Sequence, residues 1–115
     1  MPKKGTVVLV PFPFTNLSGV KVRPAVVVSL HSRGTDTVVA FITSRKGTRG
    51  AAGSFRVRVG DEGFARTGLK TDSFILCTKL ATLDKRVLLG ELGALAAPMR
   101  KALDQCLAYV FGLSA

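Results

Sequence analysis

The sequence predicts a mainly β fold, a small antiparallel barrel or rolled sheet with one amphipathic helix packed on it. Short runs of β-branched and apolar residues recur between Thr6 and Leu95. Clusters of Gly, Pro, Asn, Asp and Ser separate these runs at lengths typical of hairpin links. A single stretch with helical spacing follows them, which fits a helix lying on a sheet.

The length of 115 residues, 47% of them hydrophobic and 21% charged, is enough for one domain with a real core. We therefore expect a single domain over residues 1–115. No apolar run approaches the ~20 residues that a membrane span needs. The N-terminus is a poor secretory signal, because Pro11 and Pro13 interrupt it and Lys21 and Arg23 soon follow. These features predict a cytoplasmic protein.

The first half of the chain predicts three strands. Residues 6–10 are β-branched and apolar, which is typical of a buried strand, and the prolines after them are expected to end its pairing. Residues 13–22 carry turn chemistry and predict a loop. Pro24 suits the first position of a second strand that continues to Leu30. Residues 37–42 predict the third strand.

The second half predicts three further strands and a helix. Residues 43–53 are rich in Gly and basic side chains and predict a surface loop. Residues 55–59 alternate apolar residues with two arginines, which indicates a half-exposed strand with both arginines on its solvent-facing side. Strands are also expected within residues 69–80 and 87–95, with a short helical turn at residues 83–86 between them.

The helix is expected to begin at Pro98, because proline is tolerated in a first helical turn, and to end before Gly112. Its apolar stripe consists of Met99, Leu103, Cys106, Leu107 and Val110. This stripe indicates packing against the core or another subunit rather than a ligand site. The two cysteines, Cys77 and Cys106, lie in apolar stretches, and we expect them to be free thiols in a reducing compartment.

The net charge of +10 is distributed unevenly. Residues 1–60 contain ten Lys or Arg and a single acid, Asp36, whereas residues 61–115 contain seven Lys or Arg and six acids. A one-sided basic surface indicates a polyanionic partner, which is a nucleic acid, an anionic membrane or an acidic protein.

Several kinds of catalytic site are excluded by composition. His31 is the only histidine, so one subunit cannot contain a nuclease site with two histidines as acid and base. The acids are too scattered for a two-metal site, and no Cys-x-x-Cys occurs for zinc. No Gly-rich phosphate-binding motif precedes a helix. We expect neither a metal nor a cofactor.

An arginine and a hydroxyl remain as candidate catalytic groups. Arg23 begins one apolar strand and Thr43 ends the next, so antiparallel pairing would place both at one edge of the sheet. RNA can be cleaved by attack of its own 2′-hydroxyl on the adjacent phosphorus, which a protein need only orient and stabilise. A guanidinium offers a fork for phosphate oxygens, and a hydroxyl can hold or polarise the same group. We predict that Arg23 stabilises charge rather than donates a proton.

Six segments carry a family resemblance: residues 5–14, 21–29, 42–44, 68–73, 83–85 and 89–92. Together they resemble the MazF/PemK, or Kid-like, toxins of type II toxin-antitoxin systems over essentially the whole chain. The resemblance implies a barrel related to the SH3 fold, a homodimer, and a metal-independent endoribonuclease that cuts single-stranded RNA at short motifs. The implied products are a 2′,3′-cyclic phosphate and a 5′-hydroxyl, and the implied partner is an acidic antitoxin.

The resemblance also implies residue roles. Arg23 and Thr43 match the catalytic pair, and Ser44 lies beside them in the RNA groove. The basic residues that we predict to contact RNA are Lys21, Arg45, Lys46, Arg49 and Lys79. Arg56 and Arg58 are expected on a solvated or RNA-flanking face rather than among the catalytic groups. Kid-like members carry an additional Arg and Asp where this chain has Leu76 and Thr78, so that second acid/base set is missing here.

Two other functions stay open at this point. CcdB-like toxins, on the same fold, poison DNA gyrase through a C-terminal tryptophan and lack the Arg and Thr pair. This chain has no Trp, which ranks that function lower. A plain RNA- or DNA-binding module would bind in a strongly salt-dependent way without cleaving.

Overall fold

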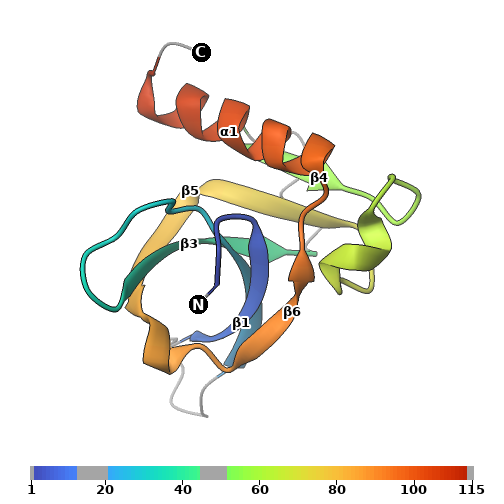
Figure 1. The fold of residues 1–115 in the computed structure, drawn as a ribbon. Coiled ribbons are helices and arrows are strands. Elements are labelled where there is room, and N and C mark those ends of the chain that lie inside the picture. The colour runs from blue at the N-terminus through green and yellow to red at the C-terminus, as the bar shows by residue number, and fades with distance from the viewer. Residues whose placement is uncertain (1, 13–20, 45–51, 114–115) are drawn as a thin grey trace.

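The computed structural model describes residues 2–12, 21–44 and 52–113. The strands are β1 (Thr6–Phe12), β2 (Lys21–Val27), β3 (Asp36–Thr43), β4 (Ser54–Val57), β5 (Ser73–Asp84) and β6 (Gly90–Ala94). The 3-10 helices η2 (Phe64–Thr67) and η3 (Lys85–Val87) precede β5 and β6, and α1 (Ala97–Phe111) follows β6. The predicted mainly β fold with a C-terminal helix is confirmed (Figure 1).

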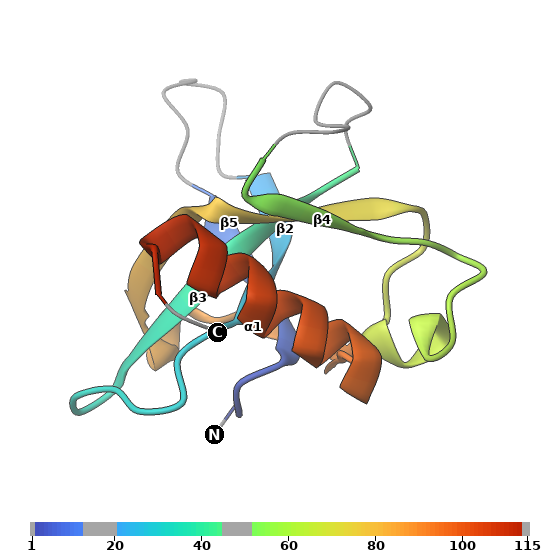
Figure 2. The same ribbon diagram turned by 90° about the horizontal axis from the view of Figure 1, so that it is seen from above.

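All six strands belong to one antiparallel sheet with the order β4-β5-β3-β2-β1-β6. The sheet curls into a half-barrel (Figure 1). Helix α1 lies across β4 and β5, as the view from above shows (Figure 2). No helix among the described residues is long and apolar enough to cross a membrane.

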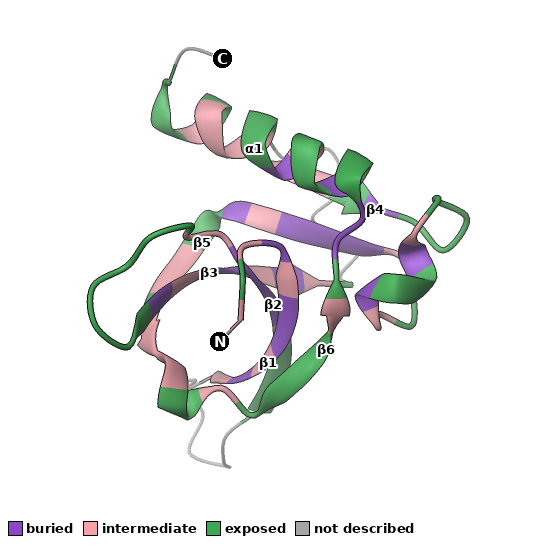
Figure 3. Cartoon of the chain, in the orientation of Figure 1, coloured by how far each residue is buried: buried purple, intermediate pink, exposed green. Residues whose placement is uncertain are grey.

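The curled sheet buries a separate core on each of its faces. The helix-side core includes Val7, Val26, Ile42, Ile75, Leu95, Met99 and Leu103. The inner core consists of Val8, Val10, Ala25, Val27 and Val39, with Phe41 packed against it. Successive residues of one strand point to opposite faces, which is why β1 contributes Val7 to one core and Val8 to the other. Consecutive residues of the central strands are therefore buried, as the purple stretches of β1, β2 and β3 show (Figure 3).

Strand β1 is longer than the sequence predicted, and β2 is shifted by three residues, since it ends at Val27 and not at Leu30. Pro11 still pairs within β1, but it lies beyond Leu9, the last residue of β1 that pairs with β6. Pro24 pairs with β1, and the ladder between β2 and β3 begins only at Ala25. Each proline thus sits where its strand has one neighbour, and its missing N–H leaves no ladder bond unmade. The predictions that pairing ends at Pro11, that the loop reaches residue 22, and that Pro24 opens β2 are wrong, because β2 begins at Lys21.

Strand β4 is shorter than predicted, and β5 is shifted. The backbone N–H of Arg58 donates to the Asp61 carboxylate at 2.8 Å, and that of Val59 donates to Asp72 at 2.8 Å. These bonds turn the chain away after Val57. Strand β5 begins at Ser73 and continues beyond the predicted end at residue 80, because its second half pairs with the first half of β3 across a bulge.

The C-terminal helix agrees with its prediction. Pro98 lies in the first turn of α1, and Gly112 caps its end with a φ of 67°. Cys77 is buried in the helix-side core, Cys106 packs against that core from α1, and both are free thiols. Burial raises the pKa of Cys77 to about 12, and a hydrogen bond with Cys106 acts in the same direction.

Candidate active site at the end of strands β2 and β3

Arg23 lies at the rim of the inner core. It pairs with Val10 of β1, which is fully buried, and directly opposed residues of antiparallel strands share a face. Ala25, the next residue of β2 on that face, is also buried, whereas Arg23 itself is exposed. No acid in the described part of the chain forms an ion pair with Arg23. The guanidinium therefore stands at the border between an apolar face and solvent.

Thr43 is the last residue of β3 and is half-buried. The β2–β3 ladder pairs Ala25 with Phe41. Arg23 precedes Ala25 by two residues and Thr43 follows Phe41 by two residues, so in antiparallel strands both lie beyond this pair in the same direction. The register thus brings the two predicted catalytic residues to the same face and the same end of the sheet.

The same row of residues continues across two more strands. Thr43 pairs with Phe74 of β5, and Phe74 pairs with Arg56 of β4. The guanidinium carbon of Arg56 lies 5.6 Å from the centre of the Phe74 ring. Its Nη2 atom donates to Oδ2 of Asp72 at 3.3 Å. A second guanidinium therefore belongs to the row that contains Arg23 and Thr43.

The sequence did not indicate this placement of Arg56. Apolar alternation assigned it to the solvated face of a strand, which is correct for β4 in isolation. The missing information is the register between β4 and β5, which sets Arg56 opposite an aromatic ring. The only local signal is Asp72, which follows a turn and precedes the apolar residues of β5.

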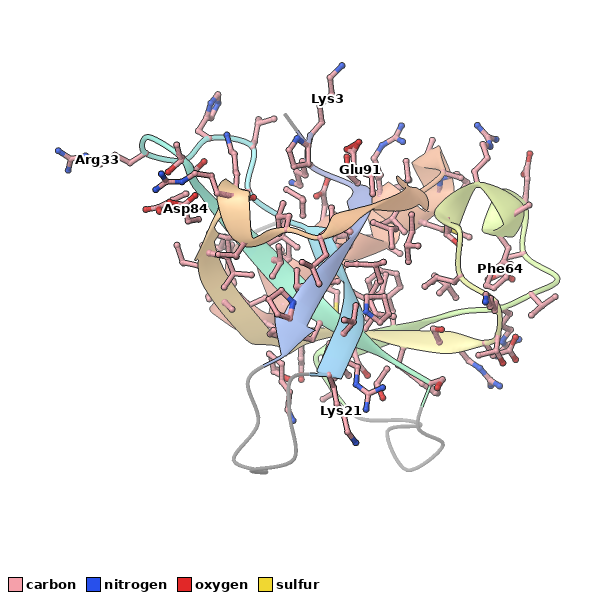
Figure 4. The ribbon with its side chains drawn as sticks, turned by 90° about the horizontal axis from the view of Figure 1, so that it is seen from below. Lys3, Lys21, Arg33, Phe64, Asp84 and Glu91 are labelled. Carbon is pink, nitrogen blue, oxygen red and sulfur yellow. The ribbon has the colours of Figure 1, made fainter. Side chains whose placement is uncertain are left out.

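The remaining predicted RNA-binding residues fall into three groups. Lys21 is exposed on β2, two residues from Arg23 and on the same face, and Ser44 is exposed directly after Thr43. Figure 4 shows Lys21 at one end of the sheet and Lys3 and Arg33 at the other. Lys79 is exposed on β5 but lies five residues from Phe74, about 16 Å along the strand, so it is not part of this row.

The basic residues Arg45, Lys46 and Arg49 lie outside the described residues. The two positions at which the resemblance led us to expect an Arg and an Asp in Kid-like members both lie on β5. Leu76 is half-buried and pairs with Phe41 and Ser54, and Thr78 is exposed. Among the described residues, no three His, Cys, Asp or Glu side chains gather as metal ligands do.

Comparison with known proteins identifies the family of the chain. The family of PemK-like, MazF-like toxins of type II toxin-antitoxin systems matches residues 3–111. No curated protein matches the sequence. The chain is similar in structure to the Mycobacterium tuberculosis toxin MazF-mt6, with a TM-score of 0.73 and 23% sequence identity over 96% of this chain and 99% of that chain.

Two further solved structures share the fold. An endoribonuclease in complex with its cognate antitoxin, from a mycobacterial species, has a TM-score of 0.73 and 21% identity over 100% of this chain and 99% of that chain. A MazE-MazF structure from Deinococcus radiodurans has a TM-score of 0.70 and 24% identity over 98% of each chain. On the strength of the family match over nearly its full length, the chain belongs to the PemK-like, MazF-like toxins of type II toxin-antitoxin systems.

Proposed function

We infer that this toxin is an endoribonuclease that cuts single-stranded RNA at short motifs, without a metal ion, at the end of β2 and β3. The observation that carries the inference is the placement of Arg23. This guanidinium is exposed, has no ion-pair partner among the described acids, and shares an edge and a face with Thr43. A cation held in this way is suited to a phosphate group.

In the proposed reaction the 2′-oxygen of a ribose attacks the adjacent phosphorus and loses its proton. The bond from phosphorus to the 5′-oxygen breaks, and that oxygen gains a proton as it leaves. The products are a 2′,3′-cyclic phosphate and a 5′-hydroxyl. Arg23 stabilises the charge that develops on the pentavalent phosphate, and Thr43 orients the 2′-hydroxyl or a phosphate oxygen.

The proposal extends to partners. We expect a cytoplasmic homodimer that is neutralised by an acidic antitoxin. The concentration of ten Lys or Arg against one acid in residues 1–60 supports an acidic partner. The similar mycobacterial endoribonuclease and the Deinococcus MazF protein were both solved with an antitoxin.

Cleavage of single-stranded RNA in the presence of EDTA tests the proposal. We expect Arg23→Ala to lower kcat/KM by about 100-fold or more, because a group that stabilises transition-state charge is lost. Arg33→Ala is the matched control, since Arg33 is an exposed arginine in the turn at the opposite end of β3. Mass spectrometry of the products distinguishes a cyclic phosphate from its hydrolysed form by one water.

Two results contradict the proposal. One is the absence of cleavage with every RNA tested, including a mixed-sequence pool. The other is equal cleavage by wild type and Arg23→Ala. Trapping of DNA gyrase by a protein without ribonuclease activity would instead support the CcdB-like function.

A further inference from the structure

The β4 end of the row supplies a cation that the family resemblance did not assign. Arg56 shares its face with Phe74, which shares its face with Thr43. Neighbouring strands lie about 4.8 Å apart, so the three steps from β2 to β4 separate Arg23 and Arg56 by roughly 14 Å along the sheet. This spacing joins backbone positions. Because the Arg56 guanidinium is held over Phe74 and bonded to Asp72, it suits a different phosphate of the strand from the one that Arg23 contacts.

The side chain of Arg56 is held in position by two contacts. Phe74 is 7% exposed, and its ring lies under the guanidinium at 5.6 Å. Oδ2 of Asp72 accepts from Nη2 at 3.3 Å. An aromatic ring beneath a guanidinium fixes its plane and leaves the edge with its N–H donors available.

The ion pair with Asp72 can exchange for another anion at low cost. The side chains of Arg56 and Asp72 are 34% and 40% exposed, and ion pairs of this kind contribute little to stability. Asp72 also has a second task, because its Oδ1 accepts from the backbone N–H of Val59 at 2.8 Å. It therefore stays in place when Arg56 turns to a new partner.

We propose that Arg56 is a second phosphate-binding residue of this site, which exchanges Asp72 for an RNA phosphate that flanks the scissile one. The proposal rests on the proposed ribonuclease function for its substrate. It places a guanidinium on β4, whereas Kid-like members carry their additional arginine on β5, where this chain has Leu76. Arg56 acts as a positioning residue: it fixes the register of the RNA and takes no part in bond breaking.

Steady-state cleavage of a short single-stranded RNA by Arg56→Met tests this role. Methionine keeps an unbranched apolar cover on Phe74 and removes the charge. We expect KM to rise about tenfold, as for loss of one charged hydrogen bond, with kcat within about threefold of wild type. The slope of log affinity against log salt, measured by fluorescence anisotropy, should fall in magnitude by about 0.7.

Two further variants separate binding from structure. Arg58→Met removes the same charge two residues along, outside β4, and should leave KM unchanged. Asp72→Asn keeps an oxygen for the N–H of Val59 and removes the competing charge, so it should lower KM. If the gain in Asp72→Asn comes through Arg56, it should disappear in the Arg56→Met/Asp72→Asn double variant, whereas a gain from the more positive field alone would persist there.

The outcomes separate this proposal from the ribonuclease proposal. Equal KM for the Arg56→Met and Arg58→Met variants, or weaker binding by Asp72→Asn, overturns the role of Arg56 while Arg23→Ala still abolishes cleavage. If no RNA is cleaved at all, anisotropy with the same RNA still tests Arg56. Unchanged affinity and salt slope in Arg56→Met would then overturn the proposal.

Discussion

The two ends of the β2–β3 pair differ in how their polar groups are satisfied. At the end that holds residues 29 and 37, the Ser29 hydroxyl accepts from the backbone N–H of Val38 at 3.0 Å and lies 3.5 Å from the hydroxyl of Thr37. At the other end, Arg23 is exposed and has no ion-pair partner among the described acids. At the first end the polar groups bond to one another within the fold. At the other end a cation remains available for a ligand.

The same contrast separates two arginines. Arg86 donates from Nη2 to Asp84 at 2.7 Å and from Nε at 3.0 Å, and these bonds hold the pKa of Asp84 well below its usual range. Thr35 adds a hydrogen bond to the same carboxylate at 3.1 Å. The guanidinium of Arg86 is therefore occupied by Asp84, whereas that of Arg23 forms no ion pair with the described acids. The two arginines carry the same charge, so their internal contacts are what separates them.

Replacing the guanidinium by an ammonium is expected to have the largest effect on this comparison. Arg23→Lys keeps the charge and loses the fork that grips two phosphate oxygens, so kcat/KM should fall by about 10- to 100-fold. Arg86→Lys keeps an ion pair with Asp84 and should cleave RNA like wild type. Wild-type activity in Arg23→Lys would show that the positive charge alone, not the fork, is sufficient for cleavage.

Two threonines on β3 provide the next test. Thr43→Val removes the hydroxyl at the candidate site and should reduce kcat about tenfold. Thr37→Val removes a hydroxyl that is 1% exposed and should instead lower stability by about 1 kcal/mol without changing kcat. Single-turnover cleavage and urea unfolding measure the two quantities. A loss of activity in Thr37→Val at unchanged stability would contradict the contrast between the two ends.

The buried thiol predicts a pH effect on stability alone. Because burial raises the pKa of Cys77 to about 12, its neutral form is favoured in the folded state. This contribution is complete below the thiol's unfolded pKa and is lost as pH rises from about 9 towards 12. Between pH 7 and pH 10.5, the free energy of unfolding measured with urea should fall further for wild type than for Cys77→Ala. Parallel losses would mean that Cys77 does not contribute.

The smallest expected effect is at Asp84. Its pKa is lowered by the bonds from Arg86, so its contribution is present above the unfolded pKa of 3.8 and is lost as pH falls through that range. Between pH 6 and pH 3, the unfolding midpoint of wild type should fall slightly further than that of Asp84→Asn. RNA cleavage at pH 7 should be the same in both proteins. A large loss of cleavage in Asp84→Asn would connect the paired end of the sheet to the site.

Local sequence patterns predicted most of the fold, and non-local pairing decided what they missed. Short β-branched and apolar runs located the strands, and Pro98 and Gly112 located the ends of α1. Whether a strand continues through Pro11 or Pro24 depends on which neighbour its missing N–H would face, and that neighbour lies elsewhere in the chain. The strand ends were therefore misplaced although the strands were found.

The site was predictable to the same degree. Arg23 and Thr43 could be placed at one edge from strand order alone, since antiparallel pairing brings the start of one strand to the end of the next. Arg56 shares the row of Arg23 and Thr43, and Lys79 lies outside it. Both placements depend on the register of β5 against its neighbours and on its bulge against β3. No pattern within β5 reveals that register.

The position of Pro24 has a consequence for the entropy of binding. A residue that precedes proline is disfavoured in helical backbone conformations, so Arg23 is confined to extended ones by its own sequence neighbour. Pairing with Val10 of β1 also restrains the backbone of Arg23. The backbone under the guanidinium is thus ordered in the free protein, and the proposed binding of RNA would cost less conformational freedom.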